Sequence, residues 1–170
     1  MTEEEAKKLK KTKENEIKGG GKIMAWTCMS YNGVGSIEFI EDSLDNIRYK
    51  RILKRNLKKN SERLIEGDFY FMQDNCRVHT EKSVLDWLCE NDFKLLDWPP
   101  KSPDMNPIEN LFSIIKDHLQ KFEFSKKSDL KEKIKEIWYS IETDICNHLV
   151  DSMPDRIDEL ERNKGGHTSY

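Results

Sequence analysis

After residue 21, the first apolar positions of the chain fall into two short runs on either side of a turn. Lys22 to Ser30 (KIMAWTCMS) and Val34 to Glu41 (VGSIEFIE) have the apolar spacing and the β-branched and aromatic content of strands. The intervening Tyr31-Asn32-Gly33 suits a tight turn, because Asn and Gly accept the left-handed backbone that such turns require. The pattern therefore predicts a β-hairpin.

A third apolar pattern, from Asp45 to Leu64, repeats every three to four residues and predicts an amphipathic helix. Its polar side carries a group of basic residues, namely Arg48, Arg51, Arg55, Lys58 and Lys59. Two interpretations stay open for this group. It forms either an ordinary solvated helix face or a surface that contacts the phosphates of a nucleic-acid backbone.

The next run, Asp68 to Asn75, contains consecutive apolar residues rather than an alternating pattern. Such a run predicts a strand that is buried on both faces, as in the middle of a parallel sheet. A helix from about Glu81 to Asn91 and a short strand from Phe93 to Trp98 are predicted next. A hairpin followed by alternating strands and helices indicates an α/β layered domain.

The C-terminal third is predicted to be helical after a proline-rich loop. Four of the five prolines lie between Pro99 and Pro107, and an amphipathic helix follows them. Two further helices are predicted, from about Ser128 to Ile145 and from His148 to Arg162. Pro154 is expected to kink or break the last of them.

Length and composition suit one folded domain, because the chain has 170 residues, of which 36% are hydrophobic. Residues 2 to 18 are mostly charged. We therefore expect residues 1 to 18 to be a disordered tail and the domain to span residues 19 to 170. No run of about 18 apolar residues, the length needed to cross a membrane, occurs in the sequence.

The net charge is −3, so the overall electrostatics do not indicate a nucleic-acid-binding protein, and any such role must depend on local patches. The four cysteines, Cys28, Cys76, Cys89 and Cys146, include no C-x-x-C pair. This spacing predicts reduced thiols rather than a zinc site or a redox pair.

Candidate chemistry begins with Asp74, which follows the predicted strand directly. In open α/β sheets, ligands bind beyond the carboxyl ends of the strands, and a carboxylate there is stabilised by a neighbouring cation. Asp74 is therefore a candidate metal ligand. The alternative is an ordinary aspartate that caps the turn after a strand.

The second candidate is Glu109, in the segment PPKSPDMNPIEN. Asn106 is a good N-cap and Pro107 suits the first helical position, so the start of the helix is well defined and fixes the direction of Glu109. Rigid placement of a carboxylate suits a divalent cation such as Mg²⁺ or Mn²⁺. The alternative is a capping box, in which Glu109 reaches back to the amide of Asn106.

Thirty-four residues separate Asp74 from Glu109, and they hold one predicted helix and one predicted strand. A right-handed crossover of this length returns the chain to the same end of a sheet. A metal site shared by the two acids is therefore physically plausible, but this reasoning does not identify the reaction.

These segments resemble the catalytic domain of Tc/mariner-type DDE transposases. The resemblance lies in QDN followed by His79, in LLDWPPKSPDMNPIENLFSIIK from Leu95 to Lys116, in GGGKIMAWTCMS, and in SMPDRI and GGHTSY near the C-terminus. It covers about residues 19 to 170 and implies a ribonuclease H-like fold, in which a mixed sheet is flanked by helices.

The resemblance implies that Asp74 and Glu109 are the second and third members of an acidic triad, with Asn75 and His79 as supporting residues. It also implies two Mg²⁺ or Mn²⁺ ions that activate water and then a DNA 3′-hydroxyl for attack on phosphodiester bonds. The implied partners are DNA, as transposon ends and target, and a second transposase chain. In a eukaryote the expected location is nuclear.

The sequence departs from the family pattern at its beginning. The first acid of the triad lies on a central strand upstream of the glycine-rich segment, but the 18 residues before Gly19 contain no Asp, and Asp42 is too late in the chain. We therefore expect two strand edges that face a gap. The chain is interpreted as a truncated or decayed transposase, or as a gene model that begins too late, and it is not expected to cut DNA. The alternative is a non-catalytic remnant that binds DNA or an intact transposase as a regulator.

Overall fold

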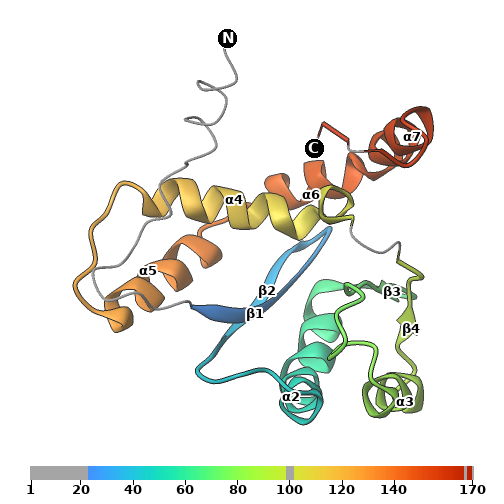
Figure 1. Cartoon of the computed structure of the whole chain (residues 1–170), viewed down its shortest axis with the longest axis horizontal. Helices are drawn as coiled ribbons and strands as arrows, with labels where there is room; N and C mark the ends of the chain where they lie inside the picture. Colours follow the sequence, from blue (N-terminus) through green and yellow to red (C-terminus); the bar gives the residue numbers. More distant parts are fainter. Residues whose placement is uncertain (1–22, 99–101, 167, 170) are drawn as a thin grey trace.

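The computed structural model describes residues 23–98, 102–166 and 168–169 (Figure 1). The predicted tail, residues 1 to 18, lies outside this part of the chain. The described elements are two hairpin strands, a helix, two short strands separated by a helix, and a helical C-terminal region. In chain order they are β1 (Met24–Ser30), β2 (Gly33–Ile40), α2 (Asn46–Leu64), β3 (Tyr70–Phe71), α3 (Lys82–Glu90), β4 (Lys94–Leu95), η1 (Pro103–Met105), α4 (Pro107–Leu119), α5 (Lys127–Tyr139), α6 (Thr143–Asp151) and α7 (Met153–Arg162).

Strands β1 and β2 form the predicted hairpin. They are antiparallel, with a register that runs from Met24 opposite Ile40 to Ser30 opposite Gly33. Gly33 has a φ of 119°, a backbone conformation that glycine adopts readily because it has no Cβ. The hairpin prediction is therefore confirmed, and the local turn residues account for it.

Strands β3 and β4 form a second, parallel pair of only two residues each. The prediction of a strand from Asp68 to Asn75 that is buried on both faces is wrong, because Tyr70 is 66% exposed. Phe71, the next residue, packs against the helices on one side of the sheet. In the described part of the chain, β3 pairs with a strand on one edge only, so the pair of strands stays short. The side chain of Tyr70 is therefore left exposed.

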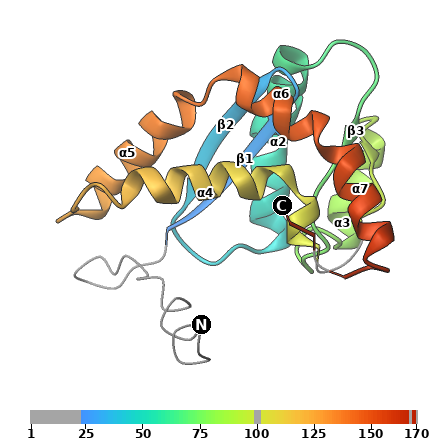
Figure 2. The same ribbon diagram turned by 90° about the horizontal axis from the view of Figure 1, so that it is seen from above.

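Helices cover the hairpin on both sides (Figures 1 and 2). On one side, α2 and α3 enclose a core with β1, which consists of Trp26, Tyr49, Ile52, Leu53, Leu57, Val84 and Leu88. On the other side, α4, α5 and α6 enclose a core with β2, which consists of Ile37, Leu111, Ile115, Ile137, Trp138, Ile141 and Cys146. This α/β layering is the arrangement that the sequence predicts.

The predicted helix from Ser128 to Ile145 is two helices, α5 and α6. Trp138 is fully buried, and its indole Nε1 donates a hydrogen bond to the carbonyl of Gly35 in β2 at 2.9 Å. The buried Ile141 follows it, and Glu142 has an extended backbone that ends any continuous helix. The chain turns between α5 and α6 because the side chains of Trp138 and Ile141 are both buried in the core.

The break expected near Pro154 is confirmed, and Pro154 lies in the first turn of a new helix rather than at a kink within one. Helix α6 ends at Asp151, and α7 starts at Met153 with Pro154 in its first turn, where a missing amide hydrogen costs nothing. The predicted helix from His148 to Arg162 is therefore also two elements. Among the described residues, no helix is long and apolar enough to cross a bilayer.

The core between α2 and β1 predicts a clear difference between two apolar positions of one helix. Leu53 is fully buried, whereas Ile47 is 55% exposed. We expect Leu53→Ala to lower the free energy of unfolding by about 2–5 kcal/mol, because it removes buried methyl groups and leaves a cavity. Ile47→Ala should change it by less than about 0.5 kcal/mol. Urea denaturation followed by circular dichroism measures both, and equal effects would contradict this core.

Candidate metal centre

A groove of about 570 Å³ lies between the two sheets. All seven residues of β1 form one wall, and the segment from Phe69 to Asp74 forms another. Side chains of α2 and of the first turns of α4 complete it from the two helical layers, among them Tyr49, Leu57, Ile108 and Phe112. Both predicted acids, Asp74 and Glu109, line this groove.

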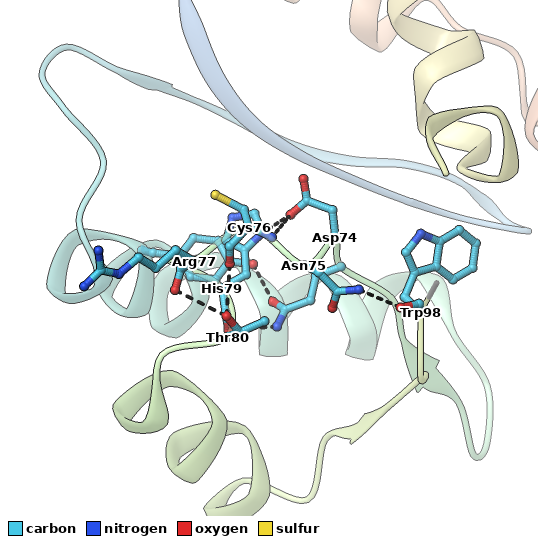
Figure 3. A network of polar contacts seen from close by, with 9 residues as sticks. Asp74, Asn75, Cys76, Arg77, His79, Thr80 and Trp98 are labelled. Carbon is cyan, nitrogen blue, oxygen red and sulfur yellow. Dashed lines mark hydrogen bonds and ion pairs between the residues drawn. The ribbon is translucent and has the colours of Figure 1, made fainter. Parts of the chain in front are cut away.

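Asp74 lies just beyond β3 and is held by one of its two carboxylate oxygens. Oδ1 accepts a hydrogen bond from the amide of Cys76 at 3.1 Å and lies 2.5 Å from Nδ1 of His79. The first contact is the turn cap that the sequence left open as an alternative. The second oxygen points away from these two partners (Figure 3), and the side chain is 61% exposed. Asp74 therefore caps its turn and still has an oxygen for a ligand.

The side chain of His79 packs against α2. Its ring lies 4.1 Å from the ring of Tyr49 on α2, and its side chain is only 19% exposed. The hydroxyl of Tyr49 donates to Oε1 of Gln73 at 2.7 Å, and Nε2 of Gln73 donates to the carbonyl of His79 at 3.1 Å. Burial raises the pKa of Tyr49, so its hydroxyl stays a neutral donor. This network fixes the imidazole that contacts Asp74.

Asn75 connects the loop of Asp74 to the segment that follows β4. Its Nδ2 donates a hydrogen bond to the carbonyl of Trp98 at 2.6 Å (Figure 3). Trp98 ends the segment after β4, immediately before the proline-rich loop that leads to Glu109. The contact makes Asn75 a tie between the Asp74 loop and that segment, whereas the sequence alone left its role open.

Glu109 lies in the first turn of α4 and is exposed. The N-cap is Asn106, whose Oδ1 accepts from the amide of Ile108 at 3.4 Å. The amide of Glu109 donates to the carbonyl of Asn106 at 3.1 Å, but within the described residues the Glu109 carboxylate makes no hydrogen bond or ion pair. The capping-box alternative is therefore not what the structure shows, and both oxygens of Glu109 are available in the groove.

Two carboxylates at one groove are a suitable but incomplete donor set for Mg²⁺ or Mn²⁺. Nowhere in residues 23–98, 102–166 and 168–169 do three or more His, Cys, Asp or Glu side chains gather for a metal ion. Mg²⁺ often takes one or two protein carboxylates and completes its shell with water and substrate phosphates. Asp74 and Glu109 fit that mode of binding.

The basic residues predicted on α2 lie on its outer side. Arg48 is paired with Asp42 at 3.0 Å, and Arg55 is paired with Glu38. The other three, Arg51, Lys58 and Lys59, are exposed and make no ion pair with any described residue. Since Tyr49 and Leu57 line the groove from the inner side of the helix, the free basic residues face away from the two acids.

Two residues of the site were not predicted from the sequence as functional. Gln73 stands directly before Asp74, which is a positional signal that could have drawn attention to it. Tyr49 is in the apolar stripe of its helix and reads as an ordinary core residue. Its contact with His79 bridges 30 positions of the sequence and depends on tertiary packing.

Cys28 on β1 has a thiol whose pKa depends on how deeply β1 is buried. Burial raises the pKa of its thiol to about 11, although the hydrogen bond with the backbone of Ser36 acts in the opposite direction. The thiolate is the reactive form, so a raised pKa suppresses reaction near neutral pH. Cys76, by contrast, is exposed next to Asp74.

We expect Cys28 to react with iodoacetamide at pH 8 at least tenfold more slowly than Cys76. At that pH only about a thousandth of the Cys28 thiol would be ionised, and its labelling should rise as the pH approaches 11. Peptide mapping by mass spectrometry measures each site, and the urea-unfolded chain, in which all cysteines are accessible, is the control. Equal labelling of the two cysteines in the folded chain would show that β1 is not buried at this wall.

Comparison with known proteins places these features in a family context. Residues 4–131 match the family model described as DDE superfamily endonuclease. The chain is 31% identical over 152 residues to the transposable element Tcb2 transposase of Caenorhabditis briggsae, which covers 89% of this chain and 56% of that protein. It is 34% identical over 154 residues to the transposable element Tc3 transposase of Caenorhabditis elegans, covering 89% and 47%. The chain thus spans about half the length of these curated relatives.

Solved structures agree on the fold. A structure of the Mos1 transposase catalytic domain with Raltegravir and Mg superposes with a TM-score of 0.82 at 20% identity, over 90% of this chain and 80% of that one. A Mos1 transposase paired-end complex with left transposon end superposes with a TM-score of 0.80 at 21% identity, over 88% and 46%. The architecture is therefore ribonuclease H-like, as the sequence resemblance implies.

Proposed function

This chain belongs to the DDE superfamily endonucleases, and from that premise we propose that it is the catalytic region of a Tc/mariner-type DNA transposase. The observation that carries the proposal is the meeting of Asp74 and Glu109 at one groove, each with carboxylate oxygen that no described residue engages. In this proposal the two acids bind the divalent ions with which DNA strands are cut and joined.

The division of labour among the residues follows from their contacts. Asp74 presents one oxygen to the groove while the other is held by His79 and by its own turn. A partner that holds one oxygen of a ligating carboxylate fixes its direction and supports its affinity for a metal ion. His79 and, through it, Tyr49 and Gln73 therefore orient Asp74, whereas Glu109 is oriented by the start of α4.

The divalent ions would supply the chemistry that carboxylates alone lack, which is activation of a hydroxyl nucleophile and stabilisation of the leaving oxygen of a phosphodiester. The task of the protein is to set two oxygen ligands in the lining of a mostly apolar groove and to leave room for a phosphate. Mos1 transposase forms a paired-end complex with a left transposon end and a strand transfer complex. We propose DNA, and pairing with a second transposase chain, for this protein too.

Metal binding provides the direct test. We expect Mn²⁺ to bind to the chain, and both Asp74→Asn and Glu109→Gln to weaken its affinity at least tenfold, because each removes a charged oxygen ligand. Asp117→Asn is the matched control, since Asp117 is an exposed acid of the same helix about 12 Å further along its axis. Isothermal titration calorimetry measures all four proteins.

The proposal of a shared site fails if only one of the two substitutions lowers Mn²⁺ affinity, or if Asp117→Asn lowers it as much as they do. Far-ultraviolet circular dichroism of each variant ensures that a loss of affinity does not come from unfolding.

A second candidate function is a non-catalytic remnant that binds DNA. The observation that favours it is the outer side of α2, where Arg51, Lys58 and Lys59 are exposed and make no ion pair with a described residue. Cations placed in this way contact a phosphate backbone without requiring the acids of the groove.

For that surface we expect Lys58→Gln combined with Lys59→Gln to reduce the slope of log affinity for duplex DNA against log salt by about 2, since each lost phosphate contact removes about 0.9. Lys121→Gln with Lys164→Gln removes the same charge from exposed positions elsewhere and should leave the slope unchanged. Fluorescence anisotropy at several salt concentrations measures it. Mg²⁺-dependent strand cleavage that is lost in Asp74→Asn would exclude the non-catalytic alternative.

A further inference from the structure

Arg156 on α7 is a buried cation outside the site described above. It is 1% exposed, and its guanidinium donates hydrogen bonds to three residues of the described chain. Nη1 reaches the carbonyl of Asp104 at 2.7 Å, Nη2 reaches Oδ1 of Asn110 at 3.0 Å, and Nε reaches Oγ of Ser152 at 2.9 Å. A charge is costly to bury, so such a side chain is retained where its hydrogen bonds hold a specific arrangement.

The first two acceptors lie on either side of the start of α4. Asp104 belongs to the turn η1, before the N-cap, and Asn110 is the residue after Glu109. A planar guanidinium that binds both at once fixes the entry of the chain into α4 and the rotation of the helix about its axis. The direction of Glu109 depends on both of these quantities.

The same turn is held from a second direction. The carboxylate Oδ2 of Asp104 accepts from the amide of Thr168 at 2.8 Å and from its hydroxyl at 2.9 Å. Arg156 in the segment SMPDRI and Thr168 near the C-terminus therefore both hold the turn that precedes Glu109.

We propose that Arg156 is a positioning residue for Glu109. It keeps the first turn of α4 in the orientation that presents the acid to the groove, and it does so through Asp104 and Asn110 without touching metal or DNA. The inference rests on the proposed function, because the orientation matters only if Glu109 is a ligand. A merely structural role is the alternative, and it predicts lower stability without any specific effect on the acid.

Two variants test this proposal. Arg156→Lys keeps the charge but cannot donate to the acceptors on Asp104 and Asn110 from two nitrogens of one planar group. Asn110→Ala removes one acceptor at a helical position that tolerates alanine well. We expect Arg156→Lys to weaken Mn²⁺ affinity by about tenfold, the lower end of the effect of losing a direct contact to a metal ligand, because Arg156 acts on Glu109 only through Asp104 and Asn110. Asn110→Ala should weaken it in the same direction by a smaller factor. If Arg156→Lys does not fold, Asn110→Ala carries the test.

Leu53→Ala is the control, because it destabilises the core on the opposite side of the hairpin from α4. It should leave Mn²⁺ affinity within about twofold of the wild type, since it removes no contact to either acid. Hydrogen exchange without metal is the second readout. Amides from 104 to 112 should exchange faster in Arg156→Lys and Asn110→Ala than in the wild type, by more than the amides of the rest of the chain. In Leu53→Ala this segment should show no increase beyond that of the rest of the chain.

Faster exchange together with weaker Mn²⁺ binding supports the inference. Unchanged exchange in this segment, or unchanged Mn²⁺ affinity in a variant whose exchange is faster, overturns it. If the wild-type chain does not bind Mn²⁺ at all, the proposed function fails instead. Hydrogen exchange in the same variants then decides by itself whether Arg156 orders the start of α4.

Discussion

The position of Glu109 depends on how helix α4 begins. Asn106 caps the helix with its own side chain, Pro107 occupies the first helical position, and the carboxylate of Glu109 is therefore not needed to satisfy an amide. A helix start that used Glu109 as a cap would turn the acid back on its own backbone. Because the cap is provided by another residue and the preceding turn is anchored to Arg156, the acid is free and its direction is fixed.

Asp74 comes to the same groove by a different route. It follows a short strand, and its loop is tied to Trp98 through Asn75 and to α2 through His79 and Tyr49. Asp74 thus lies in the loop after β3 and Glu109 on the first turn of α4, and both line the same groove. A cation placed there would draw the Asp74 loop and the start of α4 together, which connects metal binding to the packing of the whole domain.

Local signals were sufficient where the structure is determined locally. The glycine of the hairpin turn, the Asn-Pro start of α4 and the apolar stripe of α2 predict their elements correctly from a few neighbouring residues. Prediction failed where a distant partner decides the outcome. The hydrogen bond from Trp138 to Gly35 spans 103 positions and accompanies the break between α5 and α6, and the length of β3 depends on which strands are beside it. Among the site residues, Asp74 and Glu109 carry sequence signals, whereas the contact of Tyr49 with His79 arises only in the folded chain.

The central claim is that one groove brings Asp74 and Glu109 together around divalent cations. The most direct measurement is a crystal structure of the chain soaked with Mn²⁺, with anomalous diffraction used to locate the ions. The account predicts an anomalous peak at the groove within about 2.0–2.4 Å of a carboxylate oxygen of both acids. Ordered Mn²⁺ at another place, or side chains of Asp74 and Glu109 that face away from each other in that structure, would contradict it.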